Sequence, residues 1–133
     1  MRTVGPPLRS YLPALIVDRN SAAALQLASQ IRHSGFEADI AASYRAARAA
    51  VRAKHYGTLV VAADLNLAAD LAGLSDLRRG TSRAWIIVIG LHLCAEAYRT
   101  ILEHGADSLL IAPFQFEELV FRLSAFSHRS RPP

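Results

Sequence analysis

The chain has 133 residues, a formal net charge of +4 at pH 7 and a hydrophobic content of 52%. This length is typical of one domain, and the apolar share is sufficient for a buried core. The single cysteine, Cys94, excludes a disulfide framework, and no apolar run is long enough to predict a membrane-spanning helix. We therefore expect one domain in a reducing cytoplasm, with no membrane partner.

The two ends of the chain differ in composition from its middle. Residues 1–12 contain glycine, proline and arginine but lack the apolar stretch of a signal peptide, and residues 128–133 are also polar and rich in proline. We predict a flexible arm at 1–12, one folded domain at 13–127 and a flexible tail at 128–133.

Between these ends, short apolar runs alternate with segments of helical periodicity, in which apolar residues recur at i, i+3, i+4 and i+7. The elements expected in chain order are a strand at 14–18, a helix through 24–31, a strand within 33–41, a helix from Ser43 to about Lys54, a strand at 57–62, a helix through 71–77, a strand at 85–90, a helix through 94–101 that stops near Gly105, a strand at 107–111 and a helix through 116–123.

Strands that are apolar throughout favour a parallel sheet covered by helices on both faces, because each strand is then buried on both sides. The expected fold class is α/β, with a single five-stranded parallel sheet. In such folds, ligands bind at the carboxyl ends of the strands. The positions that deserve examination there are Asp18 and Arg19, residues 62–64, Gly90 and Ala112.

Several common chemistries lack their motifs at this edge. The segment VDRNSAAA after the first strand contains no glycine, which disfavours a phosphate loop for a flavin or dinucleotide. The five histidines form no i, i+3 or i, i+4 pair that would indicate a zinc site, and no G-x-S-x-G motif indicates a hydrolase. We predict that the chain is not an enzyme and holds no cofactor.

Four segments carry a family resemblance: ALIVD, SGFEADIA, IIVIG and EHGADSLLIAPFQFEEL. Together they resemble the response-regulator receiver domain over about residues 13–126. The last segment is the most specific, because it is similar to the family's Gly-Ala-Asp, strand, Lys-Pro-Phe and helix with an acidic first turn. The resemblance implies a flavodoxin-like sheet of order 2-1-3-4-5 and a role in two-component or phosphorelay signal transduction.

For a working receiver, the resemblance implies an aspartate nucleophile after the third strand, two acids after the first that hold Mg²⁺, a serine or threonine after the fourth and a lysine after the fifth. Together these groups form and neutralise an acyl phosphate. This chain has Asp18-Arg19 at the acidic pair, Gly90 at the hydroxyl position and Ala112 at the lysine position. Because guanidinium cannot ligate a metal, we expect Mg²⁺ binding to be weak or absent.

Two alignments compete for the nucleophile position. The sequence DLNL from Asp64 is similar to the family's Asp-Leu-x-Leu, but only if the alignment contains a gap. Without gaps the position falls on Ala62, and the spacings to Asp18, Gly90 and Ala112 then fit as well. We favour Ala62, which places Asp64 in the loop beside the pocket.

The two residues after the first strand also allow alternatives. Asp18 either accepts backbone hydrogen bonds and caps the following helix or keeps a role in the pocket. Arg19 either points to solvent or bends into the pocket to pair with Asp18 or Asp64 in place of metal and lysine. Ala112-Pro113 is a candidate for the family's cis peptide bond.

The favoured hypothesis is a pseudo-receiver that has lost phosphorylation and acts by protein–protein interaction. Its partner would be another signalling protein or a second copy of the chain. The resemblance implies that binding uses the face formed by the helix through 94–101, the strand at 107–111 and the helix through 116–123. The candidate face residues share an apolar side chain in or near these elements: Leu91, Leu93, Tyr98, Leu109 and Phe121.

Two other functions were weighed. The chain would be an atypical phosphoacceptor if Asp64 were the nucleophile. It would bind nucleic acid or another anionic surface if Arg45, Arg48 and Arg52 formed a binding stripe, although no known nucleic-acid-recognition motif accompanies them. A solvated helix face is the preferred interpretation, so a nucleic-acid partner is not expected.

Overall fold

The computed structural model describes residues 12–63, 68–91, 95–128 and 131–132. Within these residues, five strands form one sheet in the order β2-β1-β3-β4-β5, with every neighbouring pair parallel. The predicted fold class and strand order are confirmed. The strands are β1 (Ala14–Val17), β2 (Ala38–Ala41), β3 (Thr58–Ala62), β4 (Trp85–Leu91) and β5 (Ser108–Ala112).

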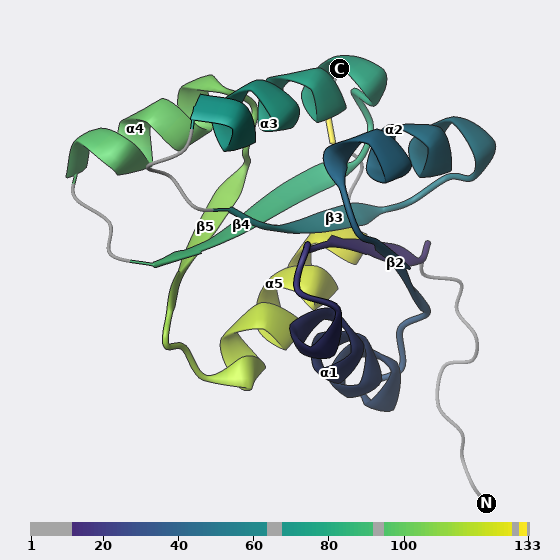
Figure 1. The fold of residues 1–133 in the computed structure, drawn as a ribbon. Coiled ribbons are helices and arrows are strands. Elements are labelled where there is room, and N and C mark those ends of the chain that lie inside the picture. The colour runs from purple at the N-terminus through teal and green to yellow at the C-terminus, as the bar shows by residue number, and fades with distance from the viewer. Residues whose placement is uncertain (1–11, 64–67, 92–94, 129–130, 133) are drawn as a thin grey trace, which may run out of the picture.

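Helices cover both faces of the sheet. They are α1 (Ser21–His33), α2 (Tyr44–Ala53), α3 (Ala68–Gly80), α4 (Ala95–Glu103) and α5 (Phe116–Ser127). Helices α2, α3 and α4 lie on one face, and α1 and α5 lie on the other (Figure 1). No helix in the described part of the chain is long and apolar enough to cross a membrane.

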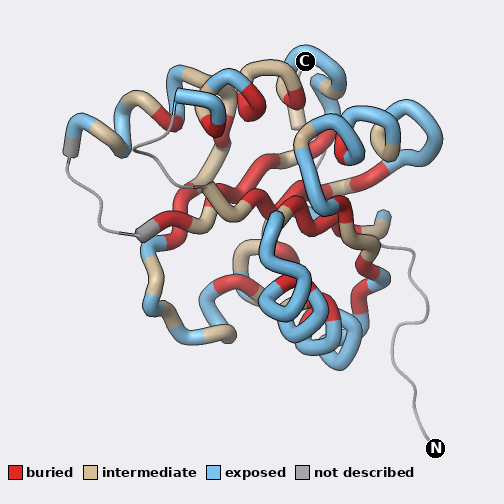
Figure 2. The backbone as a smooth tube through the Cα atoms, viewed as in Figure 1, coloured by how far each residue is buried: buried red, intermediate tan, exposed pale blue. Residues whose placement is uncertain are grey.

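The alternation of side chains along each strand divides the core into two layers. Leu15, Leu59 and Ile86 pack with Leu74 of α3 on the α2–α4 side. Their neighbours in the strands pack on the other side, where Ile16, Val60, Ile87 and Leu110 meet α1 and α5. Buried residues therefore concentrate along the strands in the middle of the molecule (Figure 2). Because both faces are buried, β1 and β4 are apolar throughout, as the sequence indicated, and β3 has a single polar residue at its start.

Side-chain caps fix where the first two helices begin. The Asn20 carboxamide oxygen accepts a hydrogen bond from the Ala23 backbone N–H at 3.0 Å, and the Ser43 hydroxyl accepts one from Ala46 at 3.0 Å. Such caps satisfy donors that would otherwise lack a helical partner. Ser43 and Lys54 flank α2, so the predicted limits of that helix are confirmed.

Arg131, near the end of the chain, belongs to a network of charged groups around Asp107. Arg131 donates from Nε to both carboxylate oxygens of Asp107, at 2.9 and 3.0 Å, and from Nη1 to the Ser82 carbonyl. Asp107 also accepts from Arg78 Nη2 at 2.7 Å and from the Ile86 backbone N–H. One carboxylate thus joins Arg131 to the start of β4, and the flexible tail at 128–133 stays a prediction.

Candidate functional site

The carboxyl ends of β1 and β3 through β5 meet at the edge where the sequence predicts a site. Asp18 follows β1, and its Oδ1 accepts a hydrogen bond from the Asn20 backbone N–H at 2.9 Å. This contact fits the interpretation in which Asp18 serves the turn into α1. One carboxylate oxygen is therefore already used by the backbone.

Arg19 reaches across this edge to a residue that the sequence analysis did not name. Its Nη2 donates to Asp70 Oδ1 at 2.8 Å and to Oδ2 at 3.0 Å. The Asp70 side chain is 1% exposed, whereas that of Arg19 is 59% exposed, so a buried carboxylate meets a guanidinium at the surface. Of the alternatives left open for Arg19, pairing with Asp18 is not observed, because Asp18 is turned back to the start of α1. Asp64, the other expected partner, lies outside the described residues.

Tyr44, the first residue of α2, packs beside this ion pair. Burial first, and then the charge of nearby Asp70, raise the pKa of the Tyr44 hydroxyl well above its ordinary value. The aromatic ring lies directly over Gly73 of α3, where an added Cβ would overlap two of the ring carbons. Gly73 therefore permits the close approach of α2 and α3, and Tyr44, Asp70 and Arg19 join three elements at one corner.

The sequence contains a signal for this corner. Asp70, Gly73, Leu74 and Leu77 are all buried and follow each other at i, i+3, i+4 and i+7. An acid on the buried stripe of a helix requires a partner, since an unpaired buried charge is costly. The expected helix pattern used Leu71, Leu74 and Leu77 and overlooked the acid.

The remaining strand ends carry no charge and no hydroxyl. Ala62 is the last residue of β3, Gly90 is next to last in β4, and Ala112 ends β5. Gly90 is aligned with Ile111, and Leu91 with Ala112, so these small residues lie at one level of the sheet. The Ala112–Pro113 peptide bond is cis, as suggested by the resemblance.

Mg²⁺ does not fit the described residues of this edge. The ion needs several oxygen ligands, usually from carboxylates. Here Asp18 serves a turn, Arg19 brings positive charge and Asp70 is bound by that charge. Among the described residues no group of three His, Cys, Asp or Glu side chains could hold a metal ion.

A second feature predicted from the sequence is the apolar face along β5. Tyr98 on α4 and Phe121 on α5 are exposed, Phe121 to 73%, and so are Leu102 on α4 and Ile111 on β5. Leu102 and Ile111 were not among the residues predicted for this face. We refer to Tyr98, Leu102, Ile111 and Phe121 as the β5-edge face.

Three other residues were expected on this face. Leu109 is buried, and Leu91 and Leu93 lie partly or wholly outside the described residues. Leu109 is only 5% exposed and packs in the core on the α2–α4 side, so its assignment to an exposed patch is wrong. The reason is that helices cover both sides of β5, which buries Leu109 and Leu110 in opposite layers. The side chain of Leu91 and all of Leu93 lie outside the described residues.

The basic stripe on α2 is partly neutralised by neighbouring acids. Arg48 lies 3.5 Å from Asp76 of α3, and Lys54, just after α2, lies 2.9 Å from Asp39 of β2. A nucleic-acid surface would instead present such cations unpaired to phosphate. The geometry agrees with a solvated helix face.

No family model and no curated protein sequence matches the chain. Solved structures of receiver domains do match its fold. A response-regulator receiver domain of Francisella superposes with a TM-score of 0.78 at 20% identity, covering 89% of this chain and 98% of that one. An orphan response regulator of H. pylori gives a TM-score of 0.76 at 21% identity, covering 90% and 98%.

A third match is an atypical orphan response regulator, described as having a phosphorylation-independent regulatory mechanism. Its TM-score is 0.74 at 20% identity, covering 91% of this chain and 100% of that one. These likenesses extend over nearly the whole chain, and its fold is that of response-regulator receiver domains.

Proposed function

We propose that the chain is a receiver-type signalling module that is not controlled by phosphorylation and acts by binding another protein or a second copy of itself. The observation that carries the proposal is the Arg19–Asp70 ion pair. By the resemblance, Arg19 occupies the position of a metal-binding acid in receivers that are phosphorylated, and here its guanidinium is bound to a buried carboxylate.

The neutral strand ends support the same conclusion. Forming an acyl phosphate places several negative charges in one pocket, and receivers offset them with Mg²⁺, an ammonium and a hydroxyl. Gly90 and Ala112 supply neither of the last two groups. Removing one such donor from an active site costs about two to three orders of magnitude in rate. Because this chain lacks several of these groups, we expect little phosphoryl transfer to it.

The β5-edge face supports the binding half of the proposal. Of the six large hydrophobic residues that are exposed in the described chain, four belong to this face. Apolar surface that is grouped rather than scattered is typical of protein-binding sites. Two of the structures with the same fold are orphan regulators, and one of those is described as phosphorylation-independent.

The phosphorylation half is tested by incubating the chain with Mg²⁺ and acetyl phosphate and measuring the intact mass. A phosphate-accepting receiver processed in parallel serves as the positive control. We expect no phosphoryl adduct on this chain. An adduct on the wild type that is lost in Asp64→Ala would contradict the proposal and identify Asp64 as the acceptor.

The binding half is tested by sedimentation velocity over a range of concentrations. Phe121→Glu places a charge in the β5-edge face, and Leu25→Glu is its matched control, because Leu25 is also exposed but lies on α1. Self-association that is lost in Phe121→Glu and kept in Leu25→Glu supports this face. Self-association that both variants keep contradicts it, and a monomeric wild type leaves a different protein as the partner.

A further inference from the structure

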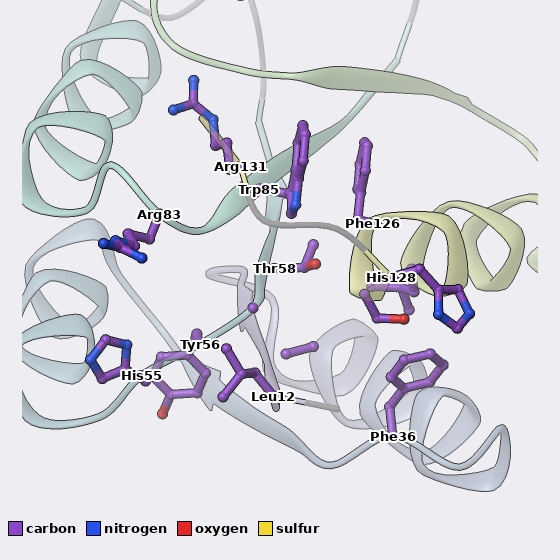
Figure 3. Close-up of a pocket in the computed structure, with 14 residues that line it drawn as sticks. Leu12, Phe36, His55, Tyr56, Thr58, Arg83, Trp85, Phe126, His128 and Arg131 are labelled. Carbon is purple, nitrogen blue, oxygen red and sulfur yellow. The ribbon is translucent and has the colours of Figure 1, made fainter. Parts of the chain in front are cut away.

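The opposite edge of the sheet contains a pocket that the function proposed above does not use. Its volume is about 410 Å³, and it lies at the amino ends of β1, β3 and β4, beside the last turn of α5 (Figure 3). Leu12, Phe36, Thr58, Trp85 and Phe126 line it, from five separate segments of the chain. This volume is within the range of small-molecule sites, roughly 300–1,000 Å³.

The walls of the pocket are largely aromatic. Trp85 and Phe126 are stacked, with ring centroids 4.3 Å apart and planes 2° from parallel. Phe36 and Tyr56 complete the lining, and both are mostly buried. Flat aromatic walls of this kind favour a planar, apolar body, which gains both burial and ring contacts.

Thr58 gives the pocket a polar group at its centre. It is 5% exposed, and no hydrogen bond of its hydroxyl is found among the described residues. Figure 3 shows Thr58 in the middle of the lining residues, with the rings of Trp85 and Phe126 on one side and Tyr56 on the other. A nearly buried hydroxyl without a protein partner favours a ligand that supplies one.

The charged groups around the pocket are all basic. The lining residues include Arg83, Arg131, His55 and His128, and no aspartate or glutamate is among them. Arg131 is already held by Asp107 and the Ser82 carbonyl. Arg83 is exposed, and no ion pair of its guanidinium is found within the described chain. It is therefore available to bind an anion at the rim.

These features discriminate between ligand classes. A metal cation would meet only neutral or positive groups, since no carboxylate or thiolate lines the pocket. A polyanion such as a nucleotide phosphate would find too few unpaired donors. A planar ring with one carboxylate matches the aromatic walls, the central hydroxyl and the guanidinium at the rim.

We propose that this pocket binds a small aryl carboxylate, with its ring against Trp85 and Phe126 and its carboxylate bound by Arg83, while Thr58 donates a hydrogen bond to the ligand. The inference does not depend on the proposed function, because the pocket lies at the other end of the strands.

The chain contains one tryptophan, so its indole N–H gives a single signal in a ¹H–¹⁵N correlation spectrum that reports on Trp85. The probes are benzoate, 2-naphthoate and indole-3-acetate, and naphthalene-2-carboxamide serves as the uncharged counterpart of 2-naphthoate. We expect at least one carboxylate to shift this signal saturably below about 5 mM, and the carboxamide to bind about tenfold more weakly than 2-naphthoate. No saturable shift with any of the three carboxylates would overturn the proposal.

Two variants test whether Arg83 and Thr58 bind the ligand. Arg83→Gln should raise the Kd about tenfold, while Arg99→Gln, which removes an equally exposed charge on α4, should leave it unchanged. Equal effects of the two variants would exclude Arg83 from the site. Thr58→Val keeps the side-chain shape, and we expect it to raise the Kd about threefold with an unchanged or higher Tm. A lowered Tm with unchanged affinity would show that the hydroxyl serves the fold instead of a ligand.

Discussion

The two ends of the sheet differ in how their polar groups are satisfied. At the carboxyl ends, Asp70 is bound by Arg19, Asp18 is used by a turn, and the strands finish in small neutral residues. At the amino ends, the Thr58 hydroxyl and the Arg83 guanidinium border a pocket without a protein partner in the described chain. One polar group at the carboxyl ends is also unpaired, because the buried Tyr44 hydroxyl has no hydrogen-bond partner in the described chain. The two edges therefore differ in access: the unpaired groups at the amino ends border a pocket, whereas the Tyr44 hydroxyl is enclosed.

The largest effect is expected from disrupting the packing of α2 on α3 at the carboxyl ends of the strands. Gly73→Ala should destabilise the protein by about 2–3 kcal/mol, because the new methyl group would overlap the Tyr44 ring. In an ordinary helix the same change stabilises by up to about 1 kcal/mol. Chemical denaturation measures the difference in free energy of unfolding.

Gly80→Ala is the matched control, since a Cβ there would make only an ordinary contact of 3.8 Å with Val51. It should be neutral or stabilising. In a Tyr44→Ala background, Gly73→Ala should no longer destabilise. If it destabilises to the same extent with and without the Tyr44 ring, packing of α2 on α3 is not the reason for Gly73.

Removing the cation at the same corner should have the next largest effect. Arg19→Ala leaves the Asp70 carboxylate buried without its guanidinium, and we expect a loss of about 2 kcal/mol, less than for a fully buried pair because Arg19 is largely exposed. Arg19→Ala combined with Asp70→Asn should recover most of this loss, since no unpaired charge remains. Thermal and urea unfolding at pH 7 measure both.

The exposed pair of Arg79 and Asp76 provides the comparison for this variant. Arg79→Ala removes an equivalent cation from the same protein and should cost less than about 0.5 kcal/mol. An Arg19→Ala variant as stable as Arg79→Ala would mean that Asp70 tolerates burial without a cation. The Arg19–Asp70 ion pair would then not stabilise the fold.

A smaller effect is expected near the pocket at the amino ends. The Tyr56 hydroxyl donates to Asp39 Oδ2 at 2.6 Å, and this bond, followed by that from Lys54, lowers the pKa of Asp39 below 3.8. Tyr56→Phe should cost about 1 kcal/mol at pH 7. A lowered carboxylate pKa stabilises the fold above pH 3.8, so the difference between variant and wild type should shrink as the pH falls through the folded pKa.

At alkaline pH the dependence of stability on pH has the opposite direction, because stability is then lost as the pH rises. Burial, and then the bond to Asp39, raise the pKa of Tyr56 from 10.0 to about 12. A raised pKa contributes stability that is present below pH 10.0 and lost as the pH approaches 12. Wild-type stability should fall over this interval more steeply than that of Tyr56→Phe, whereas Tyr98→Phe on the exposed face should follow the wild type. Parallel curves for all three would contradict a stabilising bond from the Tyr56 hydroxyl to Asp39.

Much of the fold could be predicted from the sequence because its signals are local. Apolar runs such as 57–62 and 85–90 became β3 and β4 within one residue, and the Ser43 cap fixed the start of α2. Gly90 and Ala112 could be placed at the carboxyl ends of β4 and β5 because the apolar runs 85–90 and 107–111 end at or beside them. The partner of Arg19 could not be predicted in this way, since Asp70 is 51 residues further along the chain.

The pocket at the amino ends escaped prediction for a related reason. Its lining extends from Leu12 to Arg131, with one or a few residues from each segment, and no segment carries a recognisable motif. Leu109 shows a different limit of prediction from the sequence. A strand at the edge of a sheet would be expected to expose alternate side chains, but α4 and α5 cover opposite faces of β5 and bury both Leu109 and Leu110.

The Arg19–Asp70 pair also bears on how this protein can evolve. An acid at position 19 would place one more negative charge beside the buried Asp70 and take away its cation, so this single change would weaken the fold. A neutral residue at position 70 would remove that penalty. Positions 19 and 70 are therefore expected to change together rather than one at a time.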